Sequence, residues 1–143
     1  MFTGAHRVRV DEKGRLAIPA GFRKQLPEGS YVSVGQDRVL AIYPPDLWEA
    51  LDRELRTPLQ GPDQRALART LYSLSDSFEP DGQGRITLSA ESRRAAGIEA
   101  PSKAVVIGSG SRVEIWPEER WNNYSADAQE RFTEFADRVI SGH

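Results

Sequence analysis

Two arginines occupy the same place in a motif that occurs twice, and they are the residues best suited to recognise an anion. The first copy reads Asp11-Glu12-Lys13-Gly14-Arg15 and the second reads Asp81-Gly82-Gln83-Gly84-Arg85. Both copies predict a tight turn, because Asp bonds the backbone ahead of it and Gly accepts a positive φ. The guanidinium is a planar set of donors that fits phosphate oxygens or guanine edges. For a single copy, the simplest interpretation is a hairpin turn whose Arg pairs with its Asp.

Charge is distributed unevenly along the chain. The 143 residues carry a net charge of −2, which by itself disfavours a nucleic-acid partner. Residues 1–24 nevertheless hold an excess of +4, and residues 114–143 an excess of −4. Arg7 and Arg9 alternate with two valines and are expected on the exposed face of a strand. With Lys13 they give the first motif a basic setting suited to DNA, whereas Gln83 makes the second motif less basic.

Catalytic and metal-binding residues are scarce. The chain has no cysteine, and its two histidines are His6 and His143. Asp11 and Asp81 each have an Arg four residues later, which lowers a carboxylate pKa and suits it to pairing rather than acid–base work. The glycines near residues 83 and 109 precede no helix, so they predict no phosphate loop. We expect that the protein is not an enzyme and that it binds no metal ion, cofactor or small-molecule substrate.

Targeting segments are also missing from the sequence as given. No apolar run approaches the ~18–20 residues that span a bilayer. The first residues lack a basic stretch followed by an apolar one, so no signal peptide is expected. These features predict a protein of the cytoplasm with no membrane partner.

The motif belongs to a longer internal repeat. At an offset of 70 residues Ala20 matches Ala90 and Arg23 matches Arg93. At an offset of 73 a further series of residues matches: Val32 with Val105, Val34 with Ile107, Gly35 with Gly108, Ile42 with Ile115, Tyr43 with Trp116, Pro44 with Pro117 and Trp48 with Trp121. Matches in the same order, with one small insertion, indicate a duplication.

Each repeat predicts the element order β-turn-β-α-β-β. The alternation in residues 7–10 and 16–18 indicates two half-buried strands around the turn. A short helix is expected over residues 19–26, and its counterpart runs from an N-cap at Ser89 to a C-cap at Gly97. Hairpins are expected over residues 31–43 and 104–116.

Helices are expected outside the repeats. Asp46 and Glu49 resemble a capping box that opens a helix ending near residue 55. Residues 57–63 read as a linker, and residues 64–75 as a helix with Leu67, Leu71 and Leu74 on one face. An acidic C-terminal helix carries an apolar stripe of Ala128, Phe132, Phe135 and Val139, which is either internal core or a subunit contact. The aromatic residues Tyr43, Trp48, Trp116 and Trp121 are expected to pack helices against strands, with base stacking as the lesser alternative.

The expected fold is mixed α+β and mainly β. A unit of about 45 residues cannot close a core well by itself. Two copies on one chain therefore predict a pseudo-twofold pairing into a single mixed barrel, with added helices.

The sequence resembles the MraZ family of bacterial transcriptional regulators. The resemblance rests on Met1-Phe2-Thr3-Gly4, the two Asp-x-x-Gly-Arg turns and the segment Glu114-Ile115-Trp116-Pro117-Glu118-Glu119-Arg120-Trp121. It implies two SpoVT–AbrB-like swapped-hairpin repeats at residues 5–47 and 76–119, with linking helices at 48–75 and a C-terminal helix at 120–143. It also implies a ring-like homo-oligomer, associated with the nucleoid, that binds direct repeats in the promoter of the division and cell-wall gene cluster.

The motif positions carried over from this resemblance are Asp11, Gly14 and Arg15, with Asp81, Gly84 and Arg85 in the second copy. Lys13, Arg7 and Arg9 are the expected additional DNA contacts. Two other classes remain open from the residues alone. One is an oligomeric scaffold that binds no DNA, in which basic ends meet the acidic helices of neighbours, and the other is a hydrolase that depends on His6 or a carboxylate pair.

Overall fold

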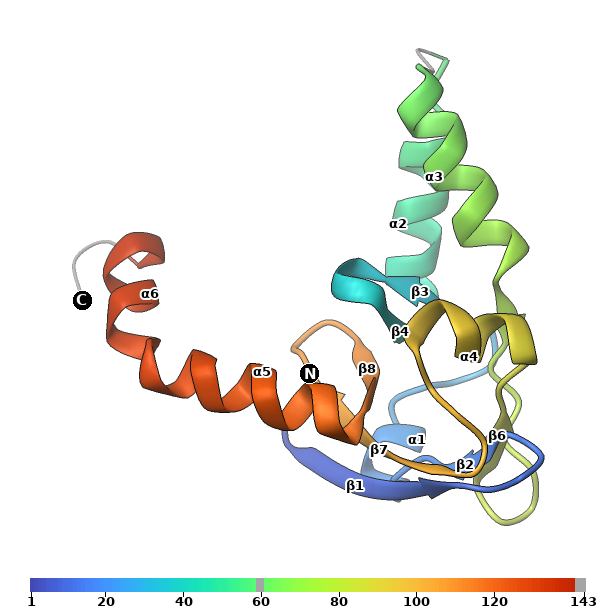
Figure 1. Ribbon diagram of the computed structural model, residues 1–143. Coiled ribbons are helices and arrows are strands. Elements are labelled where there is room, and N and C mark those ends of the chain that lie inside the picture. Colours follow the sequence, from blue (N-terminus) through green and yellow to red (C-terminus); the bar gives the residue numbers. More distant parts are fainter. Residues whose placement is uncertain (59–60, 141–143) are drawn as a thin grey trace.

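The computed structural model describes residues 1–58 and 61–140 (Figure 1). Its strands are β1 (Ala5–Val10), β2 (Arg15–Ala17), β3 (Tyr31–Gly35), β4 (Val39–Tyr43), β5 (Asp76–Ser77), β6 (Arg85–Thr87), β7 (Ser102–Gly108) and β8 (Val113–Pro117). Its helices are α1 (Ala20–Arg23), α2 (Pro45–Leu55), α3 (Pro62–Ser73), α4 (Ala90–Ala96), α5 (Glu118–Glu130) and α6 (Phe132–Val139), with a 3₁₀ turn, η1, at Gln36–Arg38. The chain is α+β as expected, but its helical residues outnumber its strand residues, so the expectation of a mainly β chain is wrong.

The strands of the two repeats interleave. The larger sheet is antiparallel and has the order β1-β7-β8-β4-β3-β5. The first strand of repeat 1 therefore pairs with the hairpin of repeat 2, and the first strand of repeat 2 pairs with the hairpin of repeat 1. Exchanging the two repeats reverses this order, which is the pseudo-twofold relation that the duplication predicts.

The hydrogen-bonded strands do not close into the barrel that we expected. Among the described residues, the six-stranded sheet is open, with β1 and β5 at its edges, and β2 pairs with β6 in a separate two-stranded sheet. The three-residue strands β2 and β6 form their hydrogen bonds with each other, across the pseudo-twofold axis. They therefore provide no hydrogen-bonded ladder that would join the edges β1 and β5 of the larger sheet.

The main core lies between the two sheets and the short helices α1 and α4. Leu16 and Ile86 enter it from the two-stranded sheet, and Val10, Leu40 and Ile115 enter it from the larger sheet. Each repeat supplies only part of each side of this core. Burial of the apolar side chains therefore requires both repeats, which is why they fold together.

The ends of several helices differ from the expectation. Ser89 and Gly97 cap α4 as predicted: the Ser92 N–H donates to Ser89 Oγ at 3.1 Å, and Gly97 has φ of 69°. The capping box at Asp46 is wrong, because α2 starts at a proline and Pro44 is its N-cap. Proline at the first helical position already has a helical φ and has no N–H to satisfy. Helix α3 likewise begins at Pro62, inside the expected linker, and residues 59–60 of that linker lie outside the described part of the chain.

The aromatic residues after the repeats pack helices against strands, as expected. Trp48 on α2 stacks on Tyr31, with ring centroids 4.8 Å apart, and also contacts Tyr43. Trp121 on α5 meets Trp116 of β8 edge-on at 5.2 Å. These contacts fix the first turns of α2 and α5 on the larger sheet.

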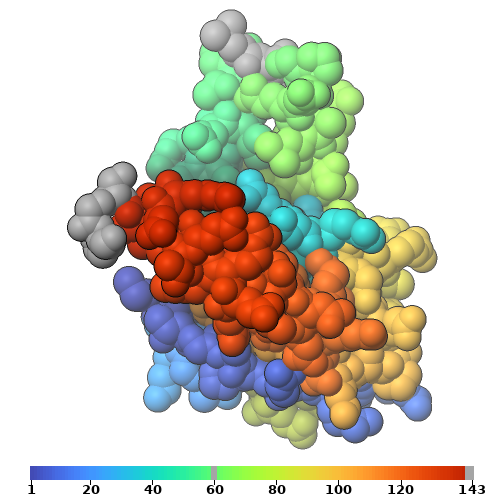
Figure 2. Space-filling view, turned by 60° about the vertical axis from the view of Figure 1, so that its left-hand side comes forward, coloured from blue at the N-terminus to red at the C-terminus, as the bar shows by residue number. Residues whose placement is uncertain are grey.

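The C-terminal segment is two helices rather than one. Arg131, with φ of −96° and ψ of 12°, separates α5 from α6, and neither helix contains a buried residue. Phe132 and Val139 are 69% and 78% exposed, so the interpretation of the apolar stripe as core of its own chain is wrong. Figures 1 and 2 show α5 and α6 as an arm on the outside of the molecule. Residues 141–143, and with them His143, lie outside the described residues.

Candidate nucleic-acid interface

The first Asp-x-x-Gly-Arg segment folds into the turn that its residues predict. The N–H groups of Lys13 and Arg15 donate to Asp11 Oδ1 at 3.0 and 2.9 Å. Arg15 Nε donates to Asp11 Oδ2 at 2.7 Å. Gly14 has φ of 80°, and its N–H donates to the Asp11 carbonyl. One carboxylate therefore holds both the backbone of the turn and the arginine that follows it.

The second turn repeats this arrangement bond for bond. Asp81 accepts from the backbone N–H of Gln83 at 2.8 Å and of Arg85 at 3.0 Å, and from Arg85 Nε at 3.0 Å. Gly84 has φ of 75°. The pairing of Arg with Asp, which was the simplest interpretation of a single motif, holds in both copies.

The two arginines lie on neighbouring strands of the small sheet. Leu16 pairs with Ile86 at its centre, and both are buried, so their neighbours along the strands face outward. Arg15 lies opposite Thr87, and Arg85 lies opposite Ala17. This register makes the arginines diagonal neighbours on one outer face of the small sheet. Diagonal neighbours in an antiparallel pair lie roughly 7–8 Å apart between their Cα atoms. The side chain of Arg15 lies on the side opposite buried Leu16 and is 33% exposed.

Two further arginines complete the arrangement. Arg23 of α1 donates from Nε to the Ile18 carbonyl, and its guanidinium lies over Gly84 of the other repeat. Arg93 of α4 lies in the same way over Gly14. We define the arginine cluster as Arg15, Arg85, Arg23 and Arg93. The last two were not among the predicted site residues, although their match at the offset of 70 was the signal that pointed to them.

Cations outnumber carboxylates at the cluster. The two turns and the helix arginines carry five cations, with Lys13 exposed, against three carboxylates, those of Asp11, Glu12 and Asp81. Within the described residues, the Nη nitrogens of Arg15 donate no hydrogen bond. The aspartate therefore binds one edge of the guanidinium and leaves the other edge to a ligand. That edge can donate to a phosphate or to a base.

Arg7 and Arg9 lie on a different surface. They project from β1 opposite the side that bears the core residue Val10, and so face away from the small sheet. Arg7 forms an ion pair with Glu118 of α5 at 3.4 Å. The structure thus does not bring these two residues to the arginine cluster.

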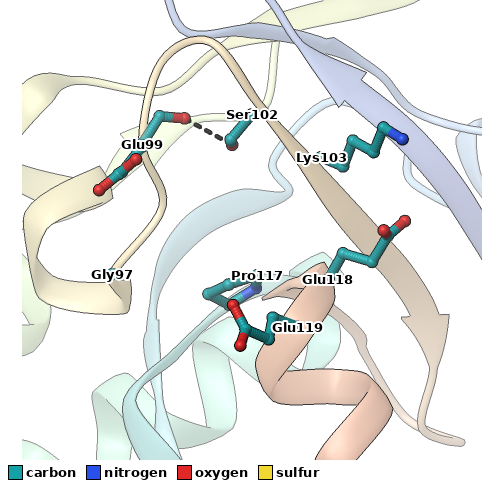
Figure 3. A pocket seen from close by; sticks show the side chains of 7 residues that line it. All are labelled: Gly97, Glu99, Ser102, Lys103, Pro117, Glu118 and Glu119. Carbon is teal, nitrogen blue, oxygen red and sulfur yellow. Dashed lines mark hydrogen bonds between the residues drawn. The ribbon is translucent and has the colours of Figure 1, made fainter.

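The hollow beside this second surface is acidic. It has a volume of about 400 Å³ and lies between the start of β7 and the start of α5, where Glu99, Glu118 and Glu119 accompany a single cation, Lys103 (Figure 3). Arg7 pairs with Glu118, and the other two carboxylates outnumber Lys103, so the hollow has no excess of positive charge for a phosphate. The electrostatics therefore favour the arginine cluster as the anion-binding surface.

The hydrogen bonds of the two turns predict that Asp11 and Asp81 titrate at a lower pH than an ordinary aspartate. Hydrogen bonds from the backbone N–H of Arg15 to Asp11, and of Arg85 to Asp81, are the largest of the effects that lower both carboxyl pKa values below their ordinary value. A carboxyl whose pKa is lower in the folded state stabilises the fold above its unfolded value of about 3.9. That contribution is lost as the pH falls through the folded pKa. We expect the carboxyl ¹³C resonances of both aspartates to titrate below the unfolded value of about 3.9; midpoints at that value would contradict the turn geometry.

Other classes of site find no support among the described residues. No group of three or more His, Cys, Asp or Glu side chains is placed to hold a metal ion in residues 1–58 and 61–140. In the same part of the chain, no helix combines the length and apolarity needed to cross a bilayer.

The fold and the paired turns define a duplicated α+β protein whose repeats exchange strands and present arginines from matched turns. The family model described as "MraZ protein, putative antitoxin-like" matches twice, over residues 1–70 and 71–141. Proteins named transcriptional regulator MraZ from Nocardia farcinica and Corynebacterium glutamicum are each 41% identical over 99% of both chains. The protein of that name from Saccharopolyspora erythraea is 40% identical over 99% of both chains. This chain belongs to the MraZ family.

Proposed function

We propose that this protein is a sequence-specific DNA-binding transcriptional regulator and not an enzyme. The observation that carries the proposal is the juxtaposition of Arg15 and Arg85, from equivalent turns of two repeats, on one outward face. Relatives that match the whole chain are named transcriptional regulators, which supports the same function. The two functional units are residues 5–47 and 76–119, and the protein works in the cytoplasm at the nucleoid.

Each turn prepares its arginine for DNA. Asp11 and Asp81 hold Nε of the following arginine, so the guanidinium is oriented before DNA arrives and loses less side-chain entropy on binding. The free edge reaches a guanine in the major groove or a phosphate. Lys13, in the first turn, adds a charged phosphate contact, whereas Gln83 can add only a neutral hydrogen bond. The first repeat therefore supplies the stronger half of the interface. Arg7 and Arg9 are secondary contacts, since they lie on another face.

Assembly is part of this function. A subunit with five cations at its site makes few phosphate contacts, and so few contacts give weak binding at physiological salt. Several subunits on adjacent sites raise the affinity through effective concentration. We propose a ring-like homo-oligomer that binds tandem direct repeats in the promoter of the division and cell-wall gene cluster.

A mobility shift with the promoter region upstream of the protein's own gene cluster tests the proposal. We expect DNA with tandem repeats to be bound at least tenfold more tightly than DNA with one repeat. We also expect the binding constant to fall steeply with salt, by about 0.9 log units per log unit of salt for each phosphate contact. An oligomer that binds neither DNA at low salt is a scaffold and contradicts the proposal. A monomer that binds one isolated repeat tightly contradicts the assembly.

A further inference from the structure

The glycine of each turn packs against an arginine of the other repeat. A Cβ on Gly14 would lie 2.9 Å from Nε of Arg93, and a Cβ on Gly84 would lie 2.6 Å from Cζ of Arg23. Real Cβ atoms essentially never come within 3.0 Å of another heavy atom. Only glycine therefore lets the guanidinium approach the backbone of the turn this closely. Each turn is packed against a side chain that its own repeat does not supply.

The first turn is also bound to the other repeat through its backbone. The N–H of Leu88 donates to the Gly14 carbonyl at 2.9 Å, and Leu88 is buried. The Leu88 carbonyl accepts a hydrogen bond from Arg93 Nε at 3.4 Å. One buried residue of repeat 2 therefore holds both the turn glycine of repeat 1 and the arginine that packs on it.

The second turn has the same arrangement with the repeats exchanged. The N–H of Ile18 donates to the Gly84 carbonyl at 3.0 Å, and Ile18 is buried. Its carbonyl accepts from Arg23 Nε at 2.8 Å. The recurrence of both hydrogen bonds and of the glycine contact shows that the arginine belongs to the repeated unit.

These contacts position each turn on the molecule. The hydrogen bonds to Asp11 and Asp81 join only residues of the same turn, so they set its internal shape. Beyond the pairing of β2 with β6, the other repeat holds the turn at its glycine, where it supplies both the N–H donor and the arginine. Arg15 directly follows Gly14, so a shift of this glycine moves the arginine on which DNA binding depends.

We propose that Arg93 and Arg23 are positioning residues that act crosswise between the repeats. Arg93 of repeat 2 holds the first turn and thereby orients Arg15 toward DNA, and Arg23 of repeat 1 does the same for Arg85. The inference rests on the proposed DNA-binding function and deepens it, because each DNA contact then depends on a residue of the opposite repeat. A positioning residue is coupled to one turn only, whereas an arginine that itself binds a phosphate contributes equally whichever turn arginine is present.

A double-mutant cycle, measured as affinity for DNA with tandem repeats, tests the coupling. Arg93→Ala is expected to weaken binding at least threefold more in the wild-type background than in an Arg15→Ala background. An Arg85→Ala background is expected to retain the full effect of Arg93→Ala, and Arg23→Ala is expected to show the reverse pattern. Arg94→Ala removes the same charge from the next, exposed position and is expected to have equal effects in both backgrounds.

The variant Arg93→Lys separates positioning from charge. Lysine keeps the positive charge and can bind a phosphate as a point charge, but it lacks the planar guanidinium that packs on the glycine. Arg93→Lys is expected to lose DNA affinity nearly as strongly as Arg93→Ala. Wild-type affinity in Arg93→Lys, or equal effects of Arg93→Ala in the two backgrounds, would identify a direct phosphate contact and overturn the proposal.

Amide hydrogen exchange tests the contacts in the free protein. The N–H groups of Arg15 and Arg85 each donate to the aspartate of their own turn. Arg93→Lys is expected to accelerate exchange at Arg15 at least threefold and to leave Arg85 unchanged, and Arg23→Lys is expected to do the opposite. Acceleration at both amides by either variant would mean that the arginines stabilise the whole fold, and it would overturn the proposal. A crosswise pattern in a protein that binds no DNA supports the contacts while the proposed regulator function fails.

Discussion

Replacing Arg15 with alanine is expected to lower the affinity for promoter DNA by about tenfold or more, because each good arginine contact is worth about 1–3 kcal/mol. The effect recurs in every subunit of an assembly. Arg15 combines the oriented guanidinium with the adjacent cation Lys13, which the second turn lacks. A mobility shift on tandem repeats, titrated with salt, measures the loss. Removal of a phosphate contact is expected to reduce the log–log salt slope by about 0.9.

Two matched variants test how much each arginine contributes to the affinity for DNA. Arg85→Ala is expected to cost less affinity than Arg15→Ala, since Gln83 supplies no second cation. Arg53→Ala, an exposed change on α2 away from both turns, is expected to cost almost nothing. All three variants are expected to melt within a few degrees of wild type. If Arg15→Ala binds as tightly as wild type, the arginine cluster is not the DNA-binding face. If it unfolds the chain, Arg15 serves the turn alone.

Gly14→Ala is expected to cause the largest loss of stability at the site. Gly14 has φ of 80°, and a Cβ there would lie 2.7 Å from the Leu88 carbonyl and 2.9 Å from Arg93 Nε. The positive φ alone costs a non-glycine residue about 1–2 kcal/mol. The clash adds to this cost, and it also disturbs the hydrogen bond from the Leu88 N–H to the Gly14 carbonyl that joins the two repeats. We expect a total near 3 kcal/mol and a melting temperature lower by about 10 °C.

Alanine substitutions at two other glycines distinguish backbone strain from the steric clash as causes of this loss of stability. Gly97 also has a positive φ, of 69°, but a Cβ there meets nothing within 4 Å, so Gly97→Ala is expected to cost only the backbone strain. Gly82 lies in the second turn with neither constraint, and Gly82→Ala is expected to change stability by less than about 1 kcal/mol. Thermal melts of the three variants test the order. Equal melting temperatures for Gly14→Ala and Gly82→Ala would contradict the close packing of the turn against the other repeat.

Much of the structure of this protein could be predicted from the sequence because it depends on interactions between residues close together in the chain. The two Asp-x-x-Gly-Arg turns form as predicted because their bonds join residues no more than four apart. The caps of α4 at Ser89 and Gly97 are likewise local. The repeat structure and the pairing of the repeats followed from the ordered matches, since a duplicated unit that is too small for a core must pair with its copy. The family resemblance followed from the same motifs.

Tertiary structure alone decided where the charged and apolar side chains face. The sequence placed Arg7, Arg9 and Arg15 in one basic segment, but β1 and β2 belong to different sheets whose outer faces point away from a shared core. The approach of Arg23 and Arg93 to glycines of the opposite repeat depends on contacts about 60–80 residues apart in the chain. The exposure of Phe132 and Val139 was open in the sequence, because an apolar stripe predicts a covered face without saying which molecule covers it. Spacing along the chain therefore determined the turns, and long-range packing determined which of their side chains meet.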